Sequence, residues 1–338
     1  MSAERAAAQS DFLARAGWGA AVRAPLPSDA SFRRYVRLTR DGETAMLMDA
    51  PPPHEDVRPY LTIARLLHGL GYSAPAILAE DAAHGFLLIE DFGDRTYTRA
   101  LAAGAAEAPL YEGAVDLLID LHRRDLAGRL DAVPPYDDAA LIRELGLFPD
   151  WWARFALAPG TNFGAEYHGH WGGLLDQMRA HPETLVLRDY HVDNLMVVER
   201  PGIQGIGLLD FQDALRGHPA YDLVSLINDA RRDVPAALAR RMIDRYEAAF
   251  PALDRAAFAT ACALLSAQRN LKIIGIFTRL AARDGKPGYL GHIPRVWRLL
   301  ENDLAHPVLA GFRAWLDDRV PAAARGAPAI PSRVTAPA

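Results

Sequence analysis

The sequence predicts an α+β chain with two lobes, a small N-terminal lobe on an antiparallel sheet and a larger, mostly helical C-terminal lobe. Short β-branched and aromatic runs fill the first ninety residues, with helical spacing in two segments only. Helical spacing dominates the rest of the chain. A chain of 338 residues is too long for a single small hydrophobic core. We expect lobes over 1–94 and 95–320, a hinge at about 90–94 and a disordered tail over 321–338.

The predicted N-terminal lobe consists of a helix, a hairpin, a second helix and two further strands. Asp41-Gly42 is a typical hairpin turn between the first two strands. Because side chains alternate along a strand, Tyr35 and Arg37 fall on one face, opposite Val36 and Leu38. The elements lie over 4–17, 32–39, 44–49, 55–70, 76–79 and 85–89.

The C-terminal lobe is predicted to be helical, with short apolar strands in its middle. The strands fall at 185–187, 195–198 and 206–209. Trp151, Trp152 and Trp171 suit either a sugar platform or packing, and we expect packing. The helices are expected over 107–124, 139–157, 165–180, from 221, 236–250, 256–279 and 293–304.

Composition excludes several classes of protein. Lys and Arg number 37 against 42 Asp and Glu, a net charge of −5, so we expect no nucleic-acid partner. A single cysteine excludes an internal disulfide framework and a cysteine-rich zinc site. The chain has no apolar run of about 18 residues and no secretory signal at its start. We therefore expect a cytoplasmic protein with no membrane contact, and no obligate protein partner is evident.

Two loops carry the residues that most directly suggest a reaction. Asp189 lies in the first loop, with Asn194 five residues later, and Asp210 ends an apolar strand sixteen residues after Asn194. Phosphoryl transfer to a hydroxyl needs a carboxylate that orients the acceptor and takes its proton. It also needs amide and carboxylate oxygens that hold Mg²⁺ against nucleotide phosphates. The spacing therefore predicts Asp189 as the base and Asn194 and Asp210 as magnesium ligands.

These motifs resemble those of the aminoglycoside phosphotransferase-like kinases over roughly residues 20–310. His191 follows Asp189 by two residues, and Gln212 replaces the Gly of Asp-Phe-Gly. Gly217 to Leu223 matches a downstream Gly-x-Pro-x-x-Asp-Leu, although Leu187 stands where the family usually has His. The resemblance implies a bilobal protein-kinase-like fold that uses ATP and Mg²⁺.

Three neighbouring polar residues admit more than one role. We expect His191, grouped with Asp189 at the catalytic loop, to hydrogen-bond the loop backbone and hold Asp189 in place. Asp213 is a candidate for contact with substrate or metal, or a plain loop acid. Asp222 is expected to be either a helix cap or a buried brace for the catalytic loop.

The N-terminal lobe departs from the kinase pattern because it lacks a lysine. Kinase-like folds usually carry a Lys on the third strand that pairs with the α- and β-phosphates. Here that strand is 44–49 and contains none, and both lysines of the chain follow residue 271. Arg33, Arg34 and Arg37 are the available cations. We expect Arg33 or Arg34 to replace the lysine. The alternative for these arginines is that they are solvated residues of an edge strand. The alternative for the whole chain, suggested by the missing lysine, is a catalytically silent kinase-fold binding protein.

Further nucleotide contacts are expected in the small-residue loop before the hairpin and at the hinge. Backbone N–H groups and the hydroxyls of Ser28 and Ser31 are suited to phosphate oxygens. Phe32, Glu90 and Phe92 complete this predicted set of nucleotide-binding residues.

Five stretches resemble more narrowly the anomeric N-acetylmuramate/N-acetylglucosamine kinases of Gram-negative bacteria. In that family a third strand without lysine is usual, which argues against a silent protein. The resemblance implies transfer of the ATP γ-phosphoryl group to the C1 hydroxyl, giving the α-1-phosphate. It also implies a role in peptidoglycan recycling towards UDP-N-acetylmuramate, a route that bypasses fosfomycin. The stretches are Ser28 to Tyr35, Leu47 to Pro52, Ile89 to Asp94, Leu209 to Ala214 and Gln268 to Phe277.

Gln268, Arg269 and Lys272 are the candidates for acceptor binding. They share a predicted helix, and residues 268 and 272 are one turn apart on it. N-acetylmuramate carries a lactyl carboxylate, so we expect Arg269 or Lys272 to face the sugar; the alternative is a solvated helix face. An aminoglycoside, choline or homoserine acceptor remains open at this point.

Overall fold

The computed structural model describes residues 2–27, 32–178 and 182–330 and divides into two compact units. The sheet unit comprises Met1–Leu117 and Val192–Ala214, and the helical unit comprises Leu118–His191 and Leu215–Ala338. The polar loop is therefore divided, with Asp189 in the helical unit and Asn194 in the sheet unit. The hinge expected at about 90–94 stays a prediction.

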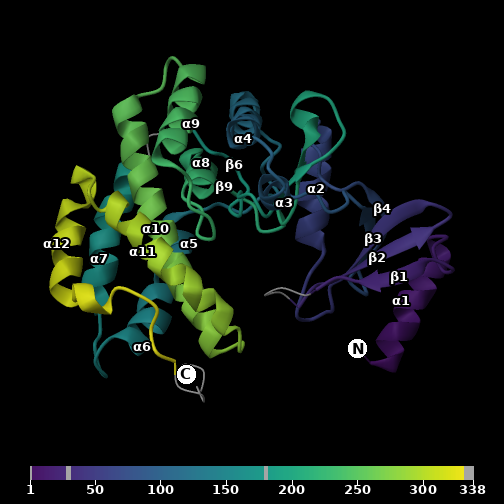
Figure 1. Cartoon of the computed structure of the whole chain (residues 1–338), viewed down its shortest axis with the longest axis horizontal. Helices are drawn as coiled ribbons and strands as arrows, with labels where there is room; N and C mark the ends of the chain where they lie inside the picture. The colour runs from purple at the N-terminus through teal and green to yellow at the C-terminus, as the bar shows by residue number, and fades with distance from the viewer. Residues whose placement is uncertain (1, 28–31, 179–181, 331–338) are drawn as a thin grey trace. The chain divides into compact units, whose positions relative to one another are not determined.

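A five-stranded antiparallel sheet, in the order β1-β2-β3-β5-β4, forms the centre of the sheet unit (Figure 1). The first of these strands was not predicted, because Pro25 and the residues after it read as a loop. β1 is an edge strand, where a proline costs no interior hydrogen bond, and Val22 pairs with Thr39 of β2. The strands are β1 (Val22–Pro25), β2 (Arg34–Arg40), β3 (Glu43–Asp49), β4 (Ile77–Asp81) and β5 (Phe86–Glu90).

The two faces of this sheet have different surroundings. Arg37, Met46 and Ile89, paired across β2, β3 and β5, line a cavity, whereas the alternating residues on the same strands build a core. Helix α1 (Ala3–Arg15) packs on the core face. The predicted alternation along β2 is thereby confirmed. The core includes Phe12, Leu13, Trp18, Leu38, Ala45, Leu47, Phe86 and Leu88.

A short hairpin completes the sheet unit. β7 (Leu195–Val197) and β8 (Ile206–Leu208) pair antiparallel, with Leu195 opposite Leu208. The Leu208 N–H donates to the Ser73 carbonyl at 2.7 Å, which attaches the hairpin to the rest of the unit. The helices here are α2 (Arg58–Gly69), α3 (Tyr97–Ala102) and α4 (Glu107–Arg123), whose last turns belong to the helical unit.

The helical unit is built around α10, a helix of 28 residues. The helix predicted over 139–157 is interrupted: α5 ends at Leu145 and a π-helical turn follows over Phe148–Ala153. Gly146 and Pro149, which lacks an N–H donor, account for the break. The helices are α5 (Asp138–Leu145), α6 (Arg154–Ala156), α7 (Gly164–Leu175), α8 (Ala220–Ile227), α9 (Ala236–Ala249), α10 (Arg255–Ala282), α11 (Ile293–Asp303) and α12 (Ala310–Arg319).

The helical unit also contains a two-stranded sheet, in which β6 (Thr184–Val186) pairs with β9 (Leu215–Gly217). β9 was not predicted. It is only three residues long, and its hydrogen bonds come from a strand far along the chain, so no local pattern marks it.

Aromatic side chains fill the core of the helical unit. Trp151, Trp152 and Trp171 are at most 6% exposed, so the packing interpretation is confirmed. The Trp152 indole N–H donates to the Gly326 carbonyl at 2.9 Å. The first residues of the expected tail are thus held by the helices, whereas residues 331–338 lie outside the described part of the chain.

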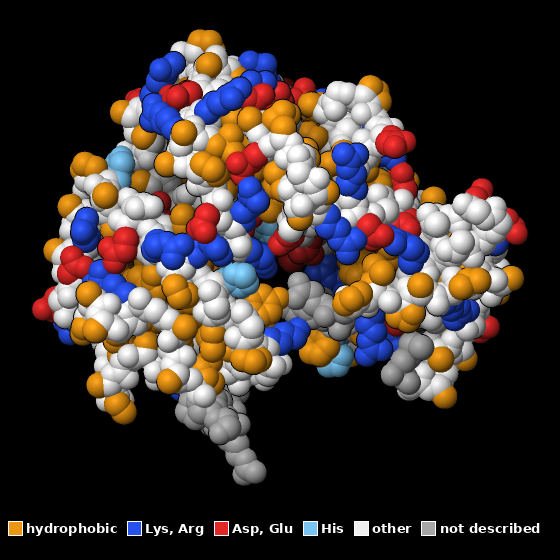
Figure 2. All heavy atoms as spheres, viewed as in Figure 1, with side chains coloured by type: hydrophobic (Ala, Val, Ile, Leu, Met, Phe, Trp, Pro, Cys, Tyr) orange, Lys and Arg blue, Asp and Glu red, His pale blue; other side chains and the backbone are white. Residues whose placement is uncertain are grey.

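Figure 2 shows one face of the molecule, on which basic and acidic side chains are interspersed with apolar ones. Among the described helices, none combines the length and the apolar composition that crossing a bilayer requires. The predicted α+β class, with an N-terminal antiparallel sheet and helices dominating the rest, is confirmed.

Candidate active site

A cavity of about 510 Å³ lies within the sheet unit. Its walls are the sheet face of Arg37, the segment after β5 and the β7–β8 hairpin. Sequence-predicted residues that are far apart along the chain come together here. They are Arg33, Glu90, Phe92, Asn194 and Asp210.

Asn194 and Asp210 are brought together by the pairing of β7 with β8. Asn194 directly precedes β7, and Asp210 follows the end of β8 by two residues. The Leu209 N–H donates to the Asn194 carbonyl at 2.9 Å, which joins the two loops. Asp210 has a φ of 56°, a left-handed conformation that non-glycine residues adopt rarely and that concentrates at functional sites.

The donor set of this pair fits a magnesium ion. Mg²⁺ prefers oxygen ligands and is usually held by one or two carboxylates together with phosphates and water. Asp210 supplies a carboxylate that is 43% exposed, and Asn194 supplies an amide oxygen in the same cavity.

The neighbours of Asp210 limit the orientation of its carboxylate. The Gln212 amide donates to Asp210 Oδ1 at 2.8 Å and to Asp213 Oδ2 at 3.1 Å. Asp213 itself is exposed and is not among the residues lining the cavity. Gln212 therefore links the two acids that follow β8, in the position where Asp-Phe-Gly has a glycine.

Arg33 lies between two acids at the edge of the cavity. Its Nη2 is 3.5 Å from Asp210 Oδ1, and its Nε is 3.7 Å from Glu55 Oε2. Burial lowers the pKa of Arg33, but Tyr35, Asp210 and Glu55 raise it by more. Burial also raises the pKa of Tyr35 to about 12. The cavity therefore contains a charged arginine beside a neutral phenol.

The other two candidate arginines are placed differently. Arg37 lines the cavity, but its Nε is 2.6 Å from Asp91 and its Nη1 is 3.0 Å from Asp94. Hydrogen bonds from Arg37 to Asp94 and Asp91 raise its pKa, and they pin the segment after β5. Arg34 is exposed and is not among the residues lining the cavity.

Glu90 and Phe92 line the cavity from the segment at the end of β5. The Glu90 carboxylate accepts a hydrogen bond from the Ala76 N–H at 3.2 Å and pairs with Arg200. The Phe92 ring packs against Gly207, where an added Cβ would lie 2.9 Å from the ring. Glycine at position 207 is therefore what permits this close packing.

The remaining predicted nucleotide contacts lie in the loop before β2. Phe32 is 63% exposed, stacks on His54 with ring centroids 4.9 Å apart, and donates its N–H to Glu55 at 3.1 Å. Ser28 and Ser31 lie outside the described residues.

In the helical unit, Asp189 lies in a loop that starts directly after β6. Arg188 has a φ of 68°, a second left-handed non-glycine residue. The Asp222 carboxylate accepts the N–H groups of Leu187 at 2.6 Å and Arg188 at 2.8 Å. Because Pro219 occupies the N-cap position of α8, Asp222 is a brace for the loop and not a helix cap.

Basic side chains act electrostatically on the Asp189 carboxylate. Burial raises the pKa of Asp189, but Lys272, His191, Arg188 and Arg269 together lower it below its usual value. Asp189 is therefore ionised at neutral pH, the state in which it can accept a proton from a hydroxyl.

His191 does not make the backbone hydrogen bond that we expected. It is 4% exposed, its Nε2 is 3.4 Å from Arg231 Nη1, and its Nδ1 has no hydrogen-bond partner among the described residues. Burial lowers its pKa, and Arg231 adds to this effect. The physical reason is that the half-buried Arg231 guanidinium lies beside the imidazole, where a backbone group was expected.

The three acceptor-binding candidates lie on α10 and are at most 8% exposed. Lys272 Nζ is 2.9 Å from Glu144 Oε1, and the Gln268 amide donates to Glu144 Oε2 at 3.2 Å. Arg269 donates to the Asn228 carbonyl at 3.2 Å. The alternative of a solvated helix face is wrong for these residues, and contact with an acceptor stays a prediction.

Two acids in these regions were missed by the sequence analysis. Glu55 lies beside Arg33, and Glu144 lies beside Arg188 and Lys272. Glu144 follows Leu141 and precedes Leu145, so an acid within an apolar helical stretch was the available signal. Nothing local identifies its cationic partners.

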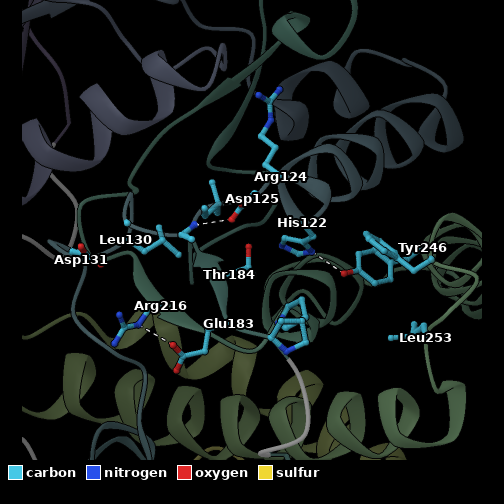
Figure 3. Close-up of a pocket in the computed structure, with 16 residues that line it drawn as sticks. His122, Arg124, Asp125, Leu130, Asp131, Glu183, Thr184, Arg216, Tyr246 and Leu253 are labelled. Atoms are coloured by element: carbon cyan, nitrogen blue, oxygen red, sulfur yellow. Dashed lines mark hydrogen bonds and ion pairs between the residues drawn. The ribbon is translucent and has the colours of Figure 1, made fainter.

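A second cavity, of about 560 Å³, lies within the helical unit (Figure 3). The Tyr246 hydroxyl is 2.7 Å from His122 Nδ1, and Arg216 pairs with Glu183 at 2.8 Å. Burial lowers the pKa of His122 to about 3, so it is neutral. None of the sequence-predicted residues lines this cavity, and we assign it no part in the reaction.

Comparisons with known proteins agree with the predicted family. The N-acetylmuramate/N-acetylglucosamine kinase of Caulobacter vibrioides is 38% identical over 360 residues, covering 96% of this chain and 99% of the relative. The enzyme of the same name from Pseudomonas aeruginosa is 42% identical over 309 residues, covering 87% and 88%.

Among solved structures, a choline/ethanolamine kinase family protein from Mesorhizobium loti has a TM-score of 0.61 at 16% identity, covering 92% of this chain and 98% of that one. This likeness concerns the fold alone, which is the predicted kinase-like one. Residues 22–259 match the phosphotransferase enzyme family. The chain therefore belongs to the phosphotransferase enzyme family and is a phosphotransferase.

Proposed function

We propose that this chain is an ATP- and Mg²⁺-dependent sugar kinase. It phosphorylates the anomeric C1 hydroxyl of N-acetylmuramate, N-acetylglucosamine or both, giving the α-1-phosphate, and it serves peptidoglycan recycling in the cytoplasm. One observation supports phosphoryl transfer most directly. Asn194 and Asp210 lie on two loops that a backbone hydrogen bond joins, and both residues line one cavity together with Arg33. The acceptor rests on the names of relatives at 38% and 42% identity.

The surroundings of Asp189 support an anionic or neutral acceptor. Lys272, Arg188 and Arg269 all act on this carboxylate. A polycationic aminoglycoside would be repelled by such a group of cations, whereas the lactyl carboxylate of N-acetylmuramate would be attracted. The same charges disfavour choline.

In the proposed reaction Asp189 orients the acceptor hydroxyl and accepts its proton as the oxygen bonds to the γ-phosphorus. The bond from that phosphorus to the bridging oxygen of ATP breaks, and ADP leaves. Asn194 and Asp210 would hold Mg²⁺, which offsets phosphate charge when bound. Gln212 and Arg33 orient the Asp210 carboxylate for this purpose.

We propose that Arg33 takes the place of the absent third-strand lysine. The β3 side chain that lines the cavity is Met46, which carries no charge. Arg37 is held by Asp91 and Asp94, and Arg34 is exposed. Arg33 touches Asp210 and stays charged, so it is suited to the phosphates.

A coupled ADP-release assay tests this function. The acceptors are N-acetylmuramate, N-acetylglucosamine, glucose, choline and kanamycin, each with ATP and Mg²⁺. Methyl α-N-acetylglucosaminide, whose C1 oxygen is blocked, serves as the control for the position of transfer, and Asp189→Ala is the enzyme blank.

Turnover on the N-acetyl sugars alone, absent with the blocked glycoside and reduced about 10²- to 10⁴-fold in Asp189→Ala, is the expected result. Turnover on choline or kanamycin would overturn the acceptor assignment. No turnover on any acceptor while ATP still binds would favour the silent binding protein.

A further inference from the structure

Glu144 gathers four donors in the interior of the helical unit. Its carboxylate pairs with Arg188, lies 2.9 Å from Lys272 Nζ, and accepts hydrogen bonds from the Tyr136 hydroxyl and the Gln268 amide. The side chains of Glu144, Lys272 and Arg188 are 13%, 10% and 19% exposed. A largely buried carboxylate with this many donors is fixed in position.

The charges of this cluster do not cancel. Glu144 supplies one negative charge, and Arg188 and Lys272 supply two positive ones. The Lys272 ammonium also lies 3.4 Å from the Tyr221 hydroxyl. One positive charge is therefore in excess, and Asp189 is the neighbouring acid on which both cations act.

We propose that Glu144 is a positioning residue for Asp189. By holding Arg188 and Lys272 in the interior, Glu144 keeps both cations close to the Asp189 carboxylate and out of direct contact with the acceptor. Lys272 then acts through Asp189, which differs from the acceptor contact expected from the sequence. This role rests on the proposed function of Asp189 as the base.

The other groups that act on Asp189 are known, so the effect of Lys272 can be separated from theirs. Each of these side chains keeps its own contacts when Lys272 alone is replaced. They are Arg188 and His191 on its own loop, Arg269 on α10 and Asp222 on α8.

The test is the pH dependence of kcat/KM in Lys272→Met, Lys272→Arg and Glu144→Gln. Asp189 must be ionised, so activity falls on the acid side as this carboxylate takes up a proton. Removing the Lys272 charge raises the pKa of Asp189, and the acid limb should move to higher pH by about one unit or more. Lys272→Arg keeps the charge and should keep the limb near its original place.

Glu144→Gln releases the two cations. Displacement of Arg188 and Lys272 raises the pKa of Asp189, so the acid limb should move to higher pH. An unmoved limb, or one at lower pH as loss of the anion alone would give, would overturn the positioning role. kcat should fall at least about tenfold because Arg188 and Lys272 lose their anchor. Thr278→Val, a buried neutral change on the same helix, is the control and should leave the limb in place.

Acceptor specificity separates positioning from direct binding. If Lys272 bound the lactyl group, Lys272→Met would raise KM for N-acetylmuramate but not for N-acetylglucosamine, with no movement of the limb; that result would overturn the role of Glu144. Lys272→Gln replaces Lys272→Met if thermal unfolding shows that the latter does not fold. Full activity in Asp189→Ala would instead reject the proposed function itself.

Discussion

The sheet unit and the helical unit distribute charge in opposite ways. In the sheet unit two cavity arginines each lie between two acids: Arg33 between Glu55 and Asp210, and Arg37 between Asp91 and Asp94. A third cavity arginine, Arg99, pairs with Asp94 at 3.2 Å, so the acids still outnumber the arginines. In the helical unit one acid, Glu144, is shared by two cations. The first arrangement leaves negative charge in excess, which suits a divalent cation. The second leaves positive charge in excess, which keeps a nearby carboxylate ionised.

The difference shows that the ratio of acidic to basic side chains, more than residue type, decides which sign of charge each region can bind. Both regions contain arginines beside acids, and both include a left-handed non-glycine residue, Asp210 in one and Arg188 in the other. What differs is the number of oppositely charged partners that the central residue of each group has. Four predictions follow from changing that count or the packing around it.

The largest effect should come from Asp222, the acid that braces the Asp189 loop. Burial raises the pKa of Asp222 from 3.8 to about 7, which corresponds to about 4 kcal/mol. The folded state therefore holds a proton that the unfolded state has lost. Its contribution to stability is complete below about pH 4 and is lost as the pH rises towards 7.

Asp222→Asn should flatten this part of the stability curve. The measurement is the free energy of unfolding in urea between pH 4 and pH 8. Burial also raises the pKa of Asp303 to about 7, so a smaller fall with the same sign should remain in the variant. If the free energy of unfolding changed with pH in the same way in wild type and variant, Asp222 would be ionised in the folded state throughout this pH range.

Asp210→Asn reduces the excess negative charge of the sheet unit. Turnover should fall about 10²- to 10³-fold at a fixed magnesium concentration, because a charge-stabilising group is lost. Asp193→Asn is the control, since Asp193 accepts a hydrogen bond from the Thr98 hydroxyl and is an acid of the same segment. Equal turnover in Asp210→Asn and wild type across a magnesium titration would contradict the proposed metal site.

Arg33→Ala tests which arginine serves the nucleotide. Loss of a charge-assisted contact worth about 1.5–3 kcal/mol should reduce kcat/KM for ATP about 10- to 150-fold. Arg34→Ala removes the adjacent, exposed arginine and should stay within about twofold of wild type, as most surface changes do. A larger loss in Arg34→Ala than in Arg33→Ala would reverse the assignment.

The smallest effect concerns packing in the same cavity. In Gly207→Ala the new Cβ would lie 2.9 Å from both the Phe92 ring and Met196 Cβ. The unfolding free energy should fall by about 1–3 kcal/mol, and KM for ATP should rise. Gly69→Ala, at the end of α2 with open space around its Cβ, should instead be neutral or stabilising by up to about 1 kcal/mol. Loss of stability in both variants would mean that alanine itself, and not the Phe92 contact, is responsible.

Local patterns identified much of the sheet unit. The Asp41-Gly42 turn and the alternation along β2 and β3 fixed the hairpin, its register and the two faces of the sheet. β1 and β9 were missed because short strands obtain their hydrogen bonds from partners distant in sequence. The break after α5 was missed although Gly146 and Pro149 signalled it.

The site was predicted unevenly for the same reason. Asn194 and Asp210 were found because each lies within two residues of a short apolar strand, so short-range spacing carries the information. Glu144 was not found, because its partner Arg188 is 44 residues away and Lys272 is farther still. His191 was found, but its contact was not. The imidazole lies beside Arg231, which is 40 residues away along the chain, and not beside the loop backbone.

By itself the sequence determined the fold class, the order of the polar residues and the absence of a lysine from the third strand. These properties depend on residue type and on spacing within a turn or a strand. Only the tertiary structure decided that Arg33 lies beside Asp210, that Asp222 braces the Asp189 loop, and that Lys272 points to Glu144 in the interior. Electrostatic interactions depend on distance and burial in space, and packing sets both between residues that the sequence keeps far apart.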